Sequence, residues 1–539
     1  MWKAHSHTLI IFLSTLLTIT HRLVSPLIME PWFVVVVSLV LCLLIRAFFN
    51  LLSPSPSPSP PLPPGPPRIP IVGSTIFLRR SFSELEPILR NLRAKYGPIF
   101  TLPVGSRSSI FIADRSLAHQ ALVQNGAVFS NRPKSLPAAR IINSNQHNIN
   151  SAPYGPTWRV LRRNLTSEML HPSRMKAFSG TRKWVLDLLF NRLRSDSESN
   201  KSIKVIDHLH YAMFCLLVFM CFGERLNDKQ IKDIEYVERR LLTNFSRFNM
   251  LSFWPKVTRI LFRKRWQELY QIRNEQEDVL IPLIRARKKA KEENNNNRDD
   301  VTVSYVDTLL DLQLPEEKRK LEEGELVTLC SEFLNAGTDT TATSLQWIMA
   351  NLVKYAHIQQ RLLEEIRDVV GEREDNKEVK EEDLIRLPYL KAIILEGLRR
   401  HPPGHFVLPH AVTEDVVLNG YLVPKNGTVN FMVGEIGLDP KEWENPMEFK
   451  PERFLNNDKD GGEAFDITGS KEIKMMPFGV GRRICPGYNL ALLHLEYFAA
   501  NLVWNFEWKS SNGDVDLSEK PEFTVMMKNP LQVHISPRF

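Results

Sequence analysis

The stretch Pro477–Gly487, PFGVGRRICPG, places a single cysteine in a loop of glycines and arginines. Glycine adopts positive φ angles and lets a backbone approach a flat ligand closely. The positive charges of Arg482 and Arg483 favour the thiolate form of Cys485. A helical pattern, Tyr488–Leu502, follows the loop, so the cysteine also lies near a helix N-terminus. The pattern predicts a functional thiolate, with a buried structural cysteine as the alternative.

The surrounding composition excludes several other classes of protein. The chain has 539 residues, of which 24% are charged and 43% hydrophobic, and its net charge is +8. These values are close to globular averages and exclude a disordered chain, a collagen-like rod and a polytopic membrane protein. Five cysteines, an odd number, do not make a disulfide framework. No second Cys or His lies at zinc-ligand spacing from the loop cysteine, and no feature indicates a nucleic-acid partner.

A second stretch, Ala336–Thr341 (AGTDTT), lies inside a long helical pattern that covers Gly324–Lys354. A glycine in mid-helix costs up to about 1 kcal/mol, which indicates that something approaches the backbone closely there. A ligand and a neighbouring helix explain this equally well. Small and hydroxyl residues share one face of the helix: Gly337, Thr340, Thr341 and Ser344.

Three further elements are ordinary when taken singly. Glu396 and Arg399, spaced i, i+3, read as a solvated helix bridge worth about 0.2–0.5 kcal/mol. The segment Pro451–Phe454 (PERF) indicates no chemistry by itself. Trp158 and Arg162, spaced i, i+4, share a helix face.

Taken together, these stretches resemble the cytochrome P-450 family of haem-thiolate enzymes. The cysteine loop matches the family pattern F-x-x-G-x-R-x-C-x-G without departure, and the other elements follow in family order from Pro63 to the end of the chain. Four stretches resemble the plant A-type group, and its eighty-nine-A subfamily in particular: DRSLAHQALV (114–123), RRNLTSEMLHPSR (162–174), DHLHYAMFCLLVFMCFG (207–223) and HPPGHFVLPH (401–410).

The resemblance implies both the fold and the chemistry. The expected fold is mainly α with small β-sheets, a single large haem-enclosing domain behind an N-terminal transmembrane anchor. Cys485 would be the proximal thiolate ligand of haem b, and thiolate ligation favours O–O cleavage. Asp339 and Thr340 would be the acid–alcohol pair that relays protons to dioxygen.

The same resemblance assigns roles to the remaining motif residues. Glu396, Arg399 and Arg453 would form a buried structural network behind the haem loop. Four residues would bind the haem propionates, since cations pair well with carboxylates: Trp158, Arg162, His410 and Arg483. Four more would contact the haem: Ala336, Gly337, Phe478 and Gly487.

The implied reaction inserts one atom of O₂ into a small apolar plant metabolite and reduces the other atom to water. Electrons would come from NADPH through a separate NADPH–cytochrome P-450 reductase, because the chain has no Gly-rich nucleotide-binding fingerprint. Cytochrome b5 is a second candidate electron donor. Two alternatives are an O₂-independent haem-thiolate isomerase or dehydratase, and a non-catalytic membrane haem sensor. The intact pair Asp339–Thr340 argues against both.

The N-terminus predicts a membrane anchor at residues 29–52. Its central run, PWFVVVVSLVLCLLI, contains no charge, and a helix needs about 20 apolar residues to span a bilayer. The anchor is followed by a proline-rich stretch, residues 53–70, and not by a signal-peptidase cleavage site, which disfavours a signal peptide. Because proline cannot continue a helix or a sheet interior, this stretch is predicted to be an extended spacer. Arginines after the anchor place the body, residues 71–539, on the cytosolic side of the endoplasmic reticulum membrane. Residues 1–28 form an N-terminal extension, which would be absent from a protein whose translation starts at Met29.

Helical periodicity dominates the body, and strand-like alternation is sparse. The expected helices include Trp184–Leu193, Leu269–Lys291, Gly324–Lys354 and Arg361–Val370. The expected strand pairs are Ile99–Val104 with Ser109–Ala113, Val416–Val423 with Thr428–Met432, and a C-terminal pair around Phe523–Met527.

Family analogy also predicts the substrate contacts, in four segments: Ser135–Asn150, the helix around Phe333 and Ala336, Gly404–Leu408, and Phe523–Met527. Arg159 and Arg163 are expected to lie on the surface, toward the reductase. His208 and His210, spaced i, i+2, do not share a helix face and are expected to be structural.

Overall fold

A computed structural model describes residues 35–42, 44–45, 60–67, 82–104, 107–198, 202–252, 255–293, 303–371, 378–455 and 465–539. The chain divides into two compact units, Met1–Pro61 and Leu62–Phe539. In the first unit, residues 35–42 and 44–45 are helical and mostly exposed. Residues 1–28, the rest of the predicted anchor, and spacer residues 53–59 and 68–70 lie outside the described residues.

The second unit begins inside the stretch that the sequence predicted to be a spacer. The Thr101 N–H donates to the carbonyl of Pro64 (2.8 Å), so this segment packs on strand β1 (Ile99–Val104). A Cβ on Gly65 would lie 2.0 Å from the Thr101 carbonyl oxygen, and only glycine permits this approach. The end of the proline-rich stretch, residues 62–67, therefore belongs to the body.

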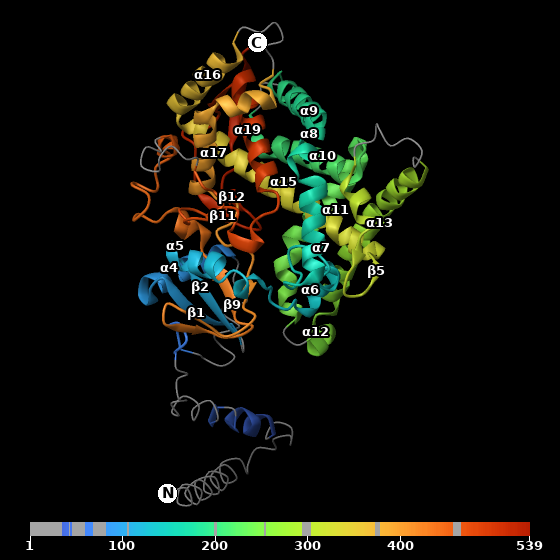
Figure 1. Ribbon diagram of the computed structural model, residues 1–539, viewed down its shortest axis with the longest axis vertical. Coiled ribbons are helices and arrows are strands. Elements are labelled where there is room, and N and C mark those ends of the chain that lie inside the picture. The colour runs from blue at the N-terminus through green and yellow to red at the C-terminus, as the bar shows by residue number, and fades with distance from the viewer. Residues whose placement is uncertain are drawn as a thin grey trace, which may run out of the picture. The chain divides into compact units, whose positions relative to one another are not determined.

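Helices make up most of the second unit (Figure 1), as the sequence predicted. The helices expected from periodicity lie within α9, α13, α15 and α16. The described helices are α4 (Phe82–Tyr96), α5 (Arg115–His119), α6 (Pro137–Ile142), α7 (Pro156–Asn164), α8 (Pro172–Ala177), α9 (Ser179–Glu198), α10 (Val205–Phe222), α11 (Asp228–Phe248), α12 (Pro255–Leu261), α13 (Arg263–Glu293), α14 (Tyr305–Leu309), α15 (Glu323–Lys354), α16 (Ala356–Val370), α17 (Pro388–Arg400), α18 (Val433–Gly437) and α19 (Tyr488–Asn505).

Helices α15 and α10 form the centre of the helical part. The 32-residue α15 begins where the Glu322 N–H donates to the Glu325 carboxylate (2.8 Å), a capping contact that satisfies a free backbone donor. It packs against α10, α13, α17 and α19. Among the described residues, α10 alone is long and apolar enough to cross a membrane, with a mean hydropathy of 1.8. Because 83% of α10 is buried inside the protein, it is a core helix.

Small sheets complete the body, and one predicted strand pair is wrong. Strand β9 (Thr428–Phe431) pairs in parallel with β2 (Arg107–Ile112), not with the segment 416–423. That segment folds on itself through the two-residue turn Asn419–Gly420, whose φ angles are +51° and +78°. The sheets are β1-β2-β9-β6, β10-β13-β3, β4-β5, β7-β8 and β11-β12, in which the other strands are β3 (Ile203–Lys204), β4 (Gln313–Leu314), β5 (Arg319–Lys320), β6 (His410–Ala411), β7 (Val416–Leu418), β8 (Tyr421–Val423), β10 (Phe506–Ser510), β11 (Glu519–Pro521), β12 (Val525–Met527) and β13 (Gln532–Pro537).

The cysteine loop lies where two hydrophobic cores meet. Phe478 and Tyr488 pack against the large helical core around α10, α15 and α19. Met476 and Val480 belong to a second core, built on the four-stranded sheet. The loop is therefore held from both sides, which positions it between the helices and the sheet.

Candidate active site

Glycines hold the cysteine loop in its shape. Gly479 and Gly481 have φ angles of +70° and +76°, which residues with side chains rarely adopt. A Cβ on Gly481 would lie 2.1 Å from the carbonyl oxygen of Leu122. The Cys485 N–H donates to the carbonyl of Phe478 (2.9 Å) and closes the loop. Backbone geometry thus requires Gly479 and Gly481, and that geometry fixes the position of the cysteine.

The thiol of Cys485 has an unusual environment. Cys485 as a residue is partly exposed, whereas three other cysteines of the body are buried: Cys215, Cys221 and Cys330. Desolvation raises the pKa of the Cys485 thiol, while the Gly487 N–H and the positive charge of Arg162 lower it. A cation bound to the sulfur would deprotonate such a thiol outright.

The predicted cationic residues come together beside this loop. The Arg483 guanidinium lies 4.3 Å from the ring centre of Trp158. Arg162 donates to the carbonyl of Ile484 (2.7 Å), the residue next to the cysteine. Arg483 itself donates to three backbone carbonyls: Ser130 (2.8 Å), Ile149 (3.1 Å) and Ala152 (2.6 Å).

Arg132 joins the cluster, although no motif in the sequence singles it out. Burial lowers the pKa of Arg132 to about 10. Burial, reinforced by the charges of Arg132 and Arg162, lowers the pKa of Arg483 to about 9. His410, whose Nδ1 lies 2.7 Å from the carbonyl oxygen of Phe129, has a pKa lowered to about 3, first by burial and then by the charges of Arg132 and Arg483. Arg132 donates to the carbonyls of Asn150, Leu408 and Pro409.

This crowding of positive charge fits an anionic ligand. Among the described residues, the buried Nε1 of Trp158 has no hydrogen-bond partner, and a buried indole N–H normally finds an acceptor. A Cβ on Gly487 would meet no atom within 4 Å, so a flat group can lie against this backbone. Haem carries two carboxylates and an iron that binds thiolate. The residues present therefore fit haem.

Helix α15 presents Ala336 and Thr340 on an accessible face in the middle of an otherwise buried element. The Thr340 hydroxyl donates to the Ala336 carbonyl (2.6 Å) and keeps its lone pairs free to accept. Gly337 serves another purpose, because a Cβ there would lie 2.7 Å from Cδ1 of Leu217 in α10. Of the two explanations for this glycine, the structure supports close helix packing.

Asp339 contacts helix α10 on another side of α15. Its Oδ1 accepts a hydrogen bond from Nε2 of His210 (3.2 Å). The other ring nitrogen, Nδ1, lies 3.0 Å from Oε1 of Glu235 in α11. Sequence analysis did not indicate this contact and predicted a structural histidine. Its neighbour His208 pairs instead with Asp196 of α9 (3.1 Å).

The network predicted behind the loop is assembled. Arg399 donates to both carboxylate oxygens of Glu396 (2.7 and 2.8 Å), and both side chains are fully buried. Nε of Arg453 lies 3.3 Å from Oε1 of the same carboxylate. Arg399 also donates to the carbonyls of Gly437 (3.0 Å), Pro446 (2.9 Å) and Glu448 (3.2 Å).

Three of the predicted substrate segments contact or adjoin the site. Glu332 of α15 accepts hydrogen bonds from the N–H groups of Ile149 (2.8 Å) and Asn150 (2.7 Å), and burial raises its pKa to about 7. The Val525 N–H donates to the carbonyl of Pro403 (2.9 Å), the residue before Gly404, so the fourth segment lies beside the start of the third. No motif in the sequence singles out Glu332, although a lone carboxylate in an apolar run is a usable signal.

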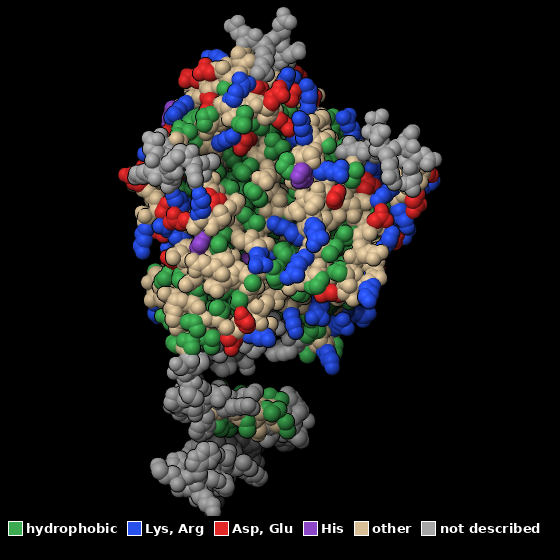
Figure 2. Space-filling view, viewed as in Figure 1, with side chains coloured by type: hydrophobic (Ala, Val, Ile, Leu, Met, Phe, Trp, Pro, Cys, Tyr) green, Lys and Arg blue, Asp and Glu red, His purple; other side chains and the backbone are tan. Residues whose placement is uncertain are grey.

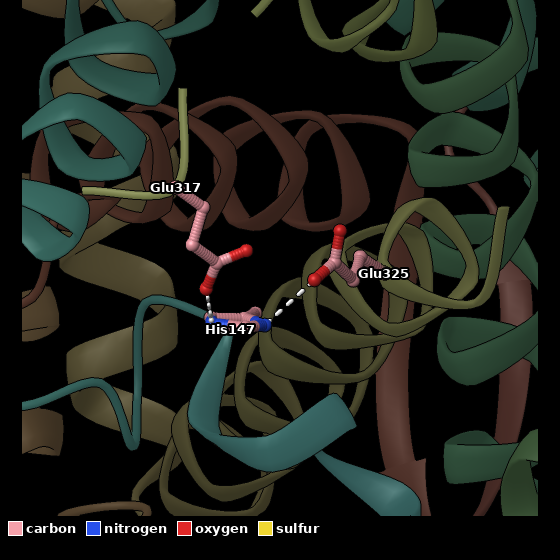
Figure 3. A group of neighbouring side chains, drawn as sticks. All are labelled: His147, Glu317 and Glu325. Atoms are coloured by element: carbon pink, nitrogen blue, oxygen red, sulfur yellow. Dashed lines mark ion pairs between the residues drawn. The ribbon is translucent and has the colours of Figure 1, made fainter. Parts of the chain in front are cut away.

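A second cluster, drawn in Figure 3, has the composition of a metal site without its geometry. Glu325 and Glu317 lie against opposite ring nitrogens of His147, at 2.6 Å from Nδ1 and 3.0 Å from Nε2. A metal would need one ring nitrogen and both carboxylates on the same side. Arg319 already pairs with both carboxylates. The cluster instead fastens the loop around His147 to the start of α15.

A helical body that holds a glycine-built cysteine loop among buried arginines has the features of a haem-thiolate protein. The chain belongs to the cytochrome P-450 family, whose family model, Cytochrome P-450, matches residues 63–535. It is therefore an oxidoreductase of the cytochrome P-450 monooxygenase class, with haem as its cofactor.

Curated relatives refine this assignment. The chain is 54% identical to Cytochrome P-450 89A9 of Arabidopsis thaliana over 490 residues, which cover 88% of this chain and 94% of that protein. This similarity supports the eighty-nine-A subfamily of plant enzymes. It is 31% identical to 5-epiaristolochene 1,3-dihydroxylase of Nicotiana tabacum (93% and 98% covered) and to isoflavone 2'-hydroxylase of Glycyrrhiza echinata (88% and 92%). A solved zebra fish cytochrome P-450 with progesterone shares the fold, with a TM-score of 0.68 at 22% identity, covering 84% of this chain and 99% of that one.

Proposed function

We propose that Cys485 ligates the haem iron and that the enzyme inserts one atom of O₂ into a small apolar plant metabolite, with electrons from NADPH through a separate reductase. The observation that carries this proposal is the glycine-built loop that holds Cys485, a partly exposed residue, beside a cluster of half-buried arginines. When bound, haem supplies the oxygen chemistry, and thiolate ligation favours O–O cleavage.

The chain's own residues bind, orient and move protons. The guanidinium groups of Arg132, Arg162 and Arg483 are placed to neutralise the propionates, and Nε1 of Trp158 is placed to donate to one of them. The Thr340 hydroxyl holds a proton at its Oγ1, on the accessible face of α15.

A small apolar substrate agrees with the segments predicted to contact it. Phe406 and Val407 lie in one segment, and the buried Val525 and Met527 lie in another. Apolar walls with a few polar groups are typical of sites for small apolar ligands. Relatives named for 5-epiaristolochene and isoflavone hydroxylation support this substrate class.

The first test of the proposal is Thr340→Ala. We expect normal haem content and a normal carbon-monoxide spectrum, because among the described residues this hydroxyl hydrogen-bonds only to its own helix. Product formed per O₂ consumed should fall at least about tenfold, since general acid catalysis contributes that much or more. The measurement is NADPH- and reductase-dependent O₂ consumption in microsomes, with the plant metabolite that gives the largest spectral shift in a panel.

Thr338→Val is the matched control. The Thr338 hydroxyl is buried without a partner among the described residues of the same helix, so its loss should leave product yield unchanged. Turnover that needs no O₂ would instead favour the isomerase or dehydratase. Absence of turnover with every compound would favour the haem sensor.

Electron delivery is proposed to use a basic surface over α7, where Figure 2 shows Lys and Arg side chains gathered. Arg159, Arg163 and Arg482 are exposed there. The Arg159 and Arg482 guanidinium groups lie 5.1 and 5.6 Å from the ring centre of Tyr154, which holds them on the surface near the cysteine loop. Positive patches steer acidic partners, so this face suits the reductase and cytochrome b5.

Membrane attachment is proposed to occur through a single-pass anchor, residues 29–52, in the endoplasmic reticulum with the body in the cytosol. Near the end of α12, Val257, Ile260 and Leu261 are also exposed, which suits a contact with lipid. Deletion of residues 1–28 should leave the protein in the membrane pellet. Deletion of residues 1–52 should release most of it into detergent-free buffer, because a helix span is effectively irreversible whereas a surface contact is not. Equal partitioning of both truncations, measured by carbonate extraction, would contradict the anchor.

A further inference from the structure

Three helices meet at one imidazole outside the haem-binding cluster. His210 of α10 lies between Asp339 of α15 and Glu235 of α11, with its two ring nitrogens 3.2 and 3.0 Å from the respective carboxylate oxygens. The contact to Asp339 has hydrogen-bond geometry, whereas the contact to Glu235 is an ion pair without it. The imidazole is only 10% exposed, against 26% and 23% for the carboxylates.

Its setting gives the imidazole one orientation and a positive charge. The Phe214 ring stacks one turn further along α10, with 6.3 Å between ring centres and 9° between planes. Burial alone would lower the pKa of His210, but the hydrogen bond to Asp339 and then the contact with Glu235 raise it to about 9. A cation between two carboxylates satisfies the rule that buried charges are paired.

Other ionisable groups near this part of α10 have partners of their own. Tyr211 donates to Asp228 of α11 (2.6 Å), and Arg192 of α9 lies 4.1 Å from the Tyr211 ring centre. His208 pairs with Asp196 of α9, and Asp207 pairs with Lys204 (2.9 Å). The charges that act on His210 are therefore those of Glu235 and Asp339.

We propose that His210 is a positioning residue, which clamps the Asp339 carboxylate through a charged hydrogen bond and ties it to α11 through Glu235. The proposal rests on the proposed function and on the acid–alcohol pair expected from the sequence, in which Asp339 serves Thr340 in proton delivery. A carboxylate that is free to rotate delivers protons from varied positions, and misplacement of a catalytic group by about 1 Å can cost a hundredfold in rate.

The test compares the full-length holoenzyme with three variants in microsomes that contain the reductase. Rates are NADPH-driven O₂ consumption without added substrate, from pH 6.5 to 9.5. His210→Gln should lower the rate about tenfold to a hundredfold at pH 7. The wild-type rate should approach that of His210→Gln as pH rises through about 9, because the clamp is lost when His210 deprotonates.

His210→Arg should rescue the rate and abolish the pH dependence, since arginine stays charged. His208→Gln, on the same helix, should behave as wild type.

A second readout is independent of turnover. Thermal unfolding of the purified holoprotein should show wild type above His210→Gln at pH 6.5. The sign follows from the raised pKa: this stabilisation is complete below about 6.5, the unfolded value, and disappears as pH rises through about 9. A wild-type enzyme without O₂ consumption would contradict the proposed function, and the unfolding curves would still decide the clamp.

Two outcomes would overturn the clamp. One is a His210→Gln unfolding midpoint that differs from wild type by the same amount at every pH. The other is an unchanged rate in His210→Gln, which would make the contact purely structural.

Discussion

Cells that express Arg399→Ala are expected to accumulate no holoprotein. Arg399 and Glu396 are fully buried and joined by two hydrogen bonds of 2.7 and 2.8 Å. Removal of the guanidinium leaves the carboxylate with Arg453, at 3.3 Å, and the Lys450 N–H, at 2.8 Å, and breaking a buried pair in this way costs about 3–5 kcal/mol. Three backbone carbonyls also lose their donor, at about 1–3 kcal/mol each. Against a total stability of about 5–15 kcal/mol, the loss is decisive.

The effect reaches the cysteine loop through packing. The Arg399 guanidinium lies 5.3 Å from the ring centre of Trp443, whose indole N–H donates to the carbonyl of Lys474 (3.2 Å), three residues before the loop begins. A body without this network therefore lacks the support that positions Cys485. The measurement is the carbon-monoxide difference spectrum of membranes, normalised to total chain by immunoblot.

Two further variants test whether burial of the Arg399–Glu396 pair explains the loss of holoprotein. Arg361 and Glu452 form an exposed pair at 2.6 Å, and exposed pairs contribute about 0–1 kcal/mol, so Arg361→Ala should give nearly normal holoprotein. Arg399→Lys keeps the charge but loses the two-pronged geometry, and an intermediate yield is expected. A normal holoprotein yield from Arg399→Ala would contradict the structural role of the network.

Local sequence signals predicted the features that depend on local geometry. The pattern Gly324–Lys354 located α15 to within one residue, because a long buried helix has a strong period. The loop glycines were predicted from their conformational freedom, and the positive φ angles of Gly479 and Gly481 confirm it for these two. The Asn419–Gly420 turn carried an equally local signal that the predicted strand pairing overlooked.

Contacts between segments that are far apart in the chain could not be predicted from local sequence patterns. Strand β9 pairs with β2 across more than 300 residues of chain, and an alternating pattern does not identify its partner. His210 lies in a helix that is apolar almost all round, so its sequence does not show which neighbour it meets. Arg132 belongs to the site only because the fold brings it beside Arg483.

Cys485→Ser is expected to remove the thiolate signature while leaving the loop intact. The backbone contact that closes the loop, from the Cys485 N–H to the Phe478 carbonyl, does not involve the side chain, so the variant should fold. A serine hydroxyl stays protonated beside Arg162 and binds iron poorly, because the thiolate is the form of cysteine that ligates metals. Haem content should fall, the carbon-monoxide spectrum should lack the thiolate band, and O₂ consumption should be lost.

Cys215→Ala separates loss of a ligand from loss of a packed thiol. Cys215 is buried in α10, and burial raises its pKa to about 12, which keeps it protonated. We expect the Cys215→Ala variant to unfold at a lower temperature, because a small cavity replaces the thiol, yet to keep a full thiolate band. If Cys485→Ser also kept that band, the ligand would have to be another cysteine. Because the described body offers only buried thiols besides Cys485, a retained band would require the helical core itself to open toward the haem.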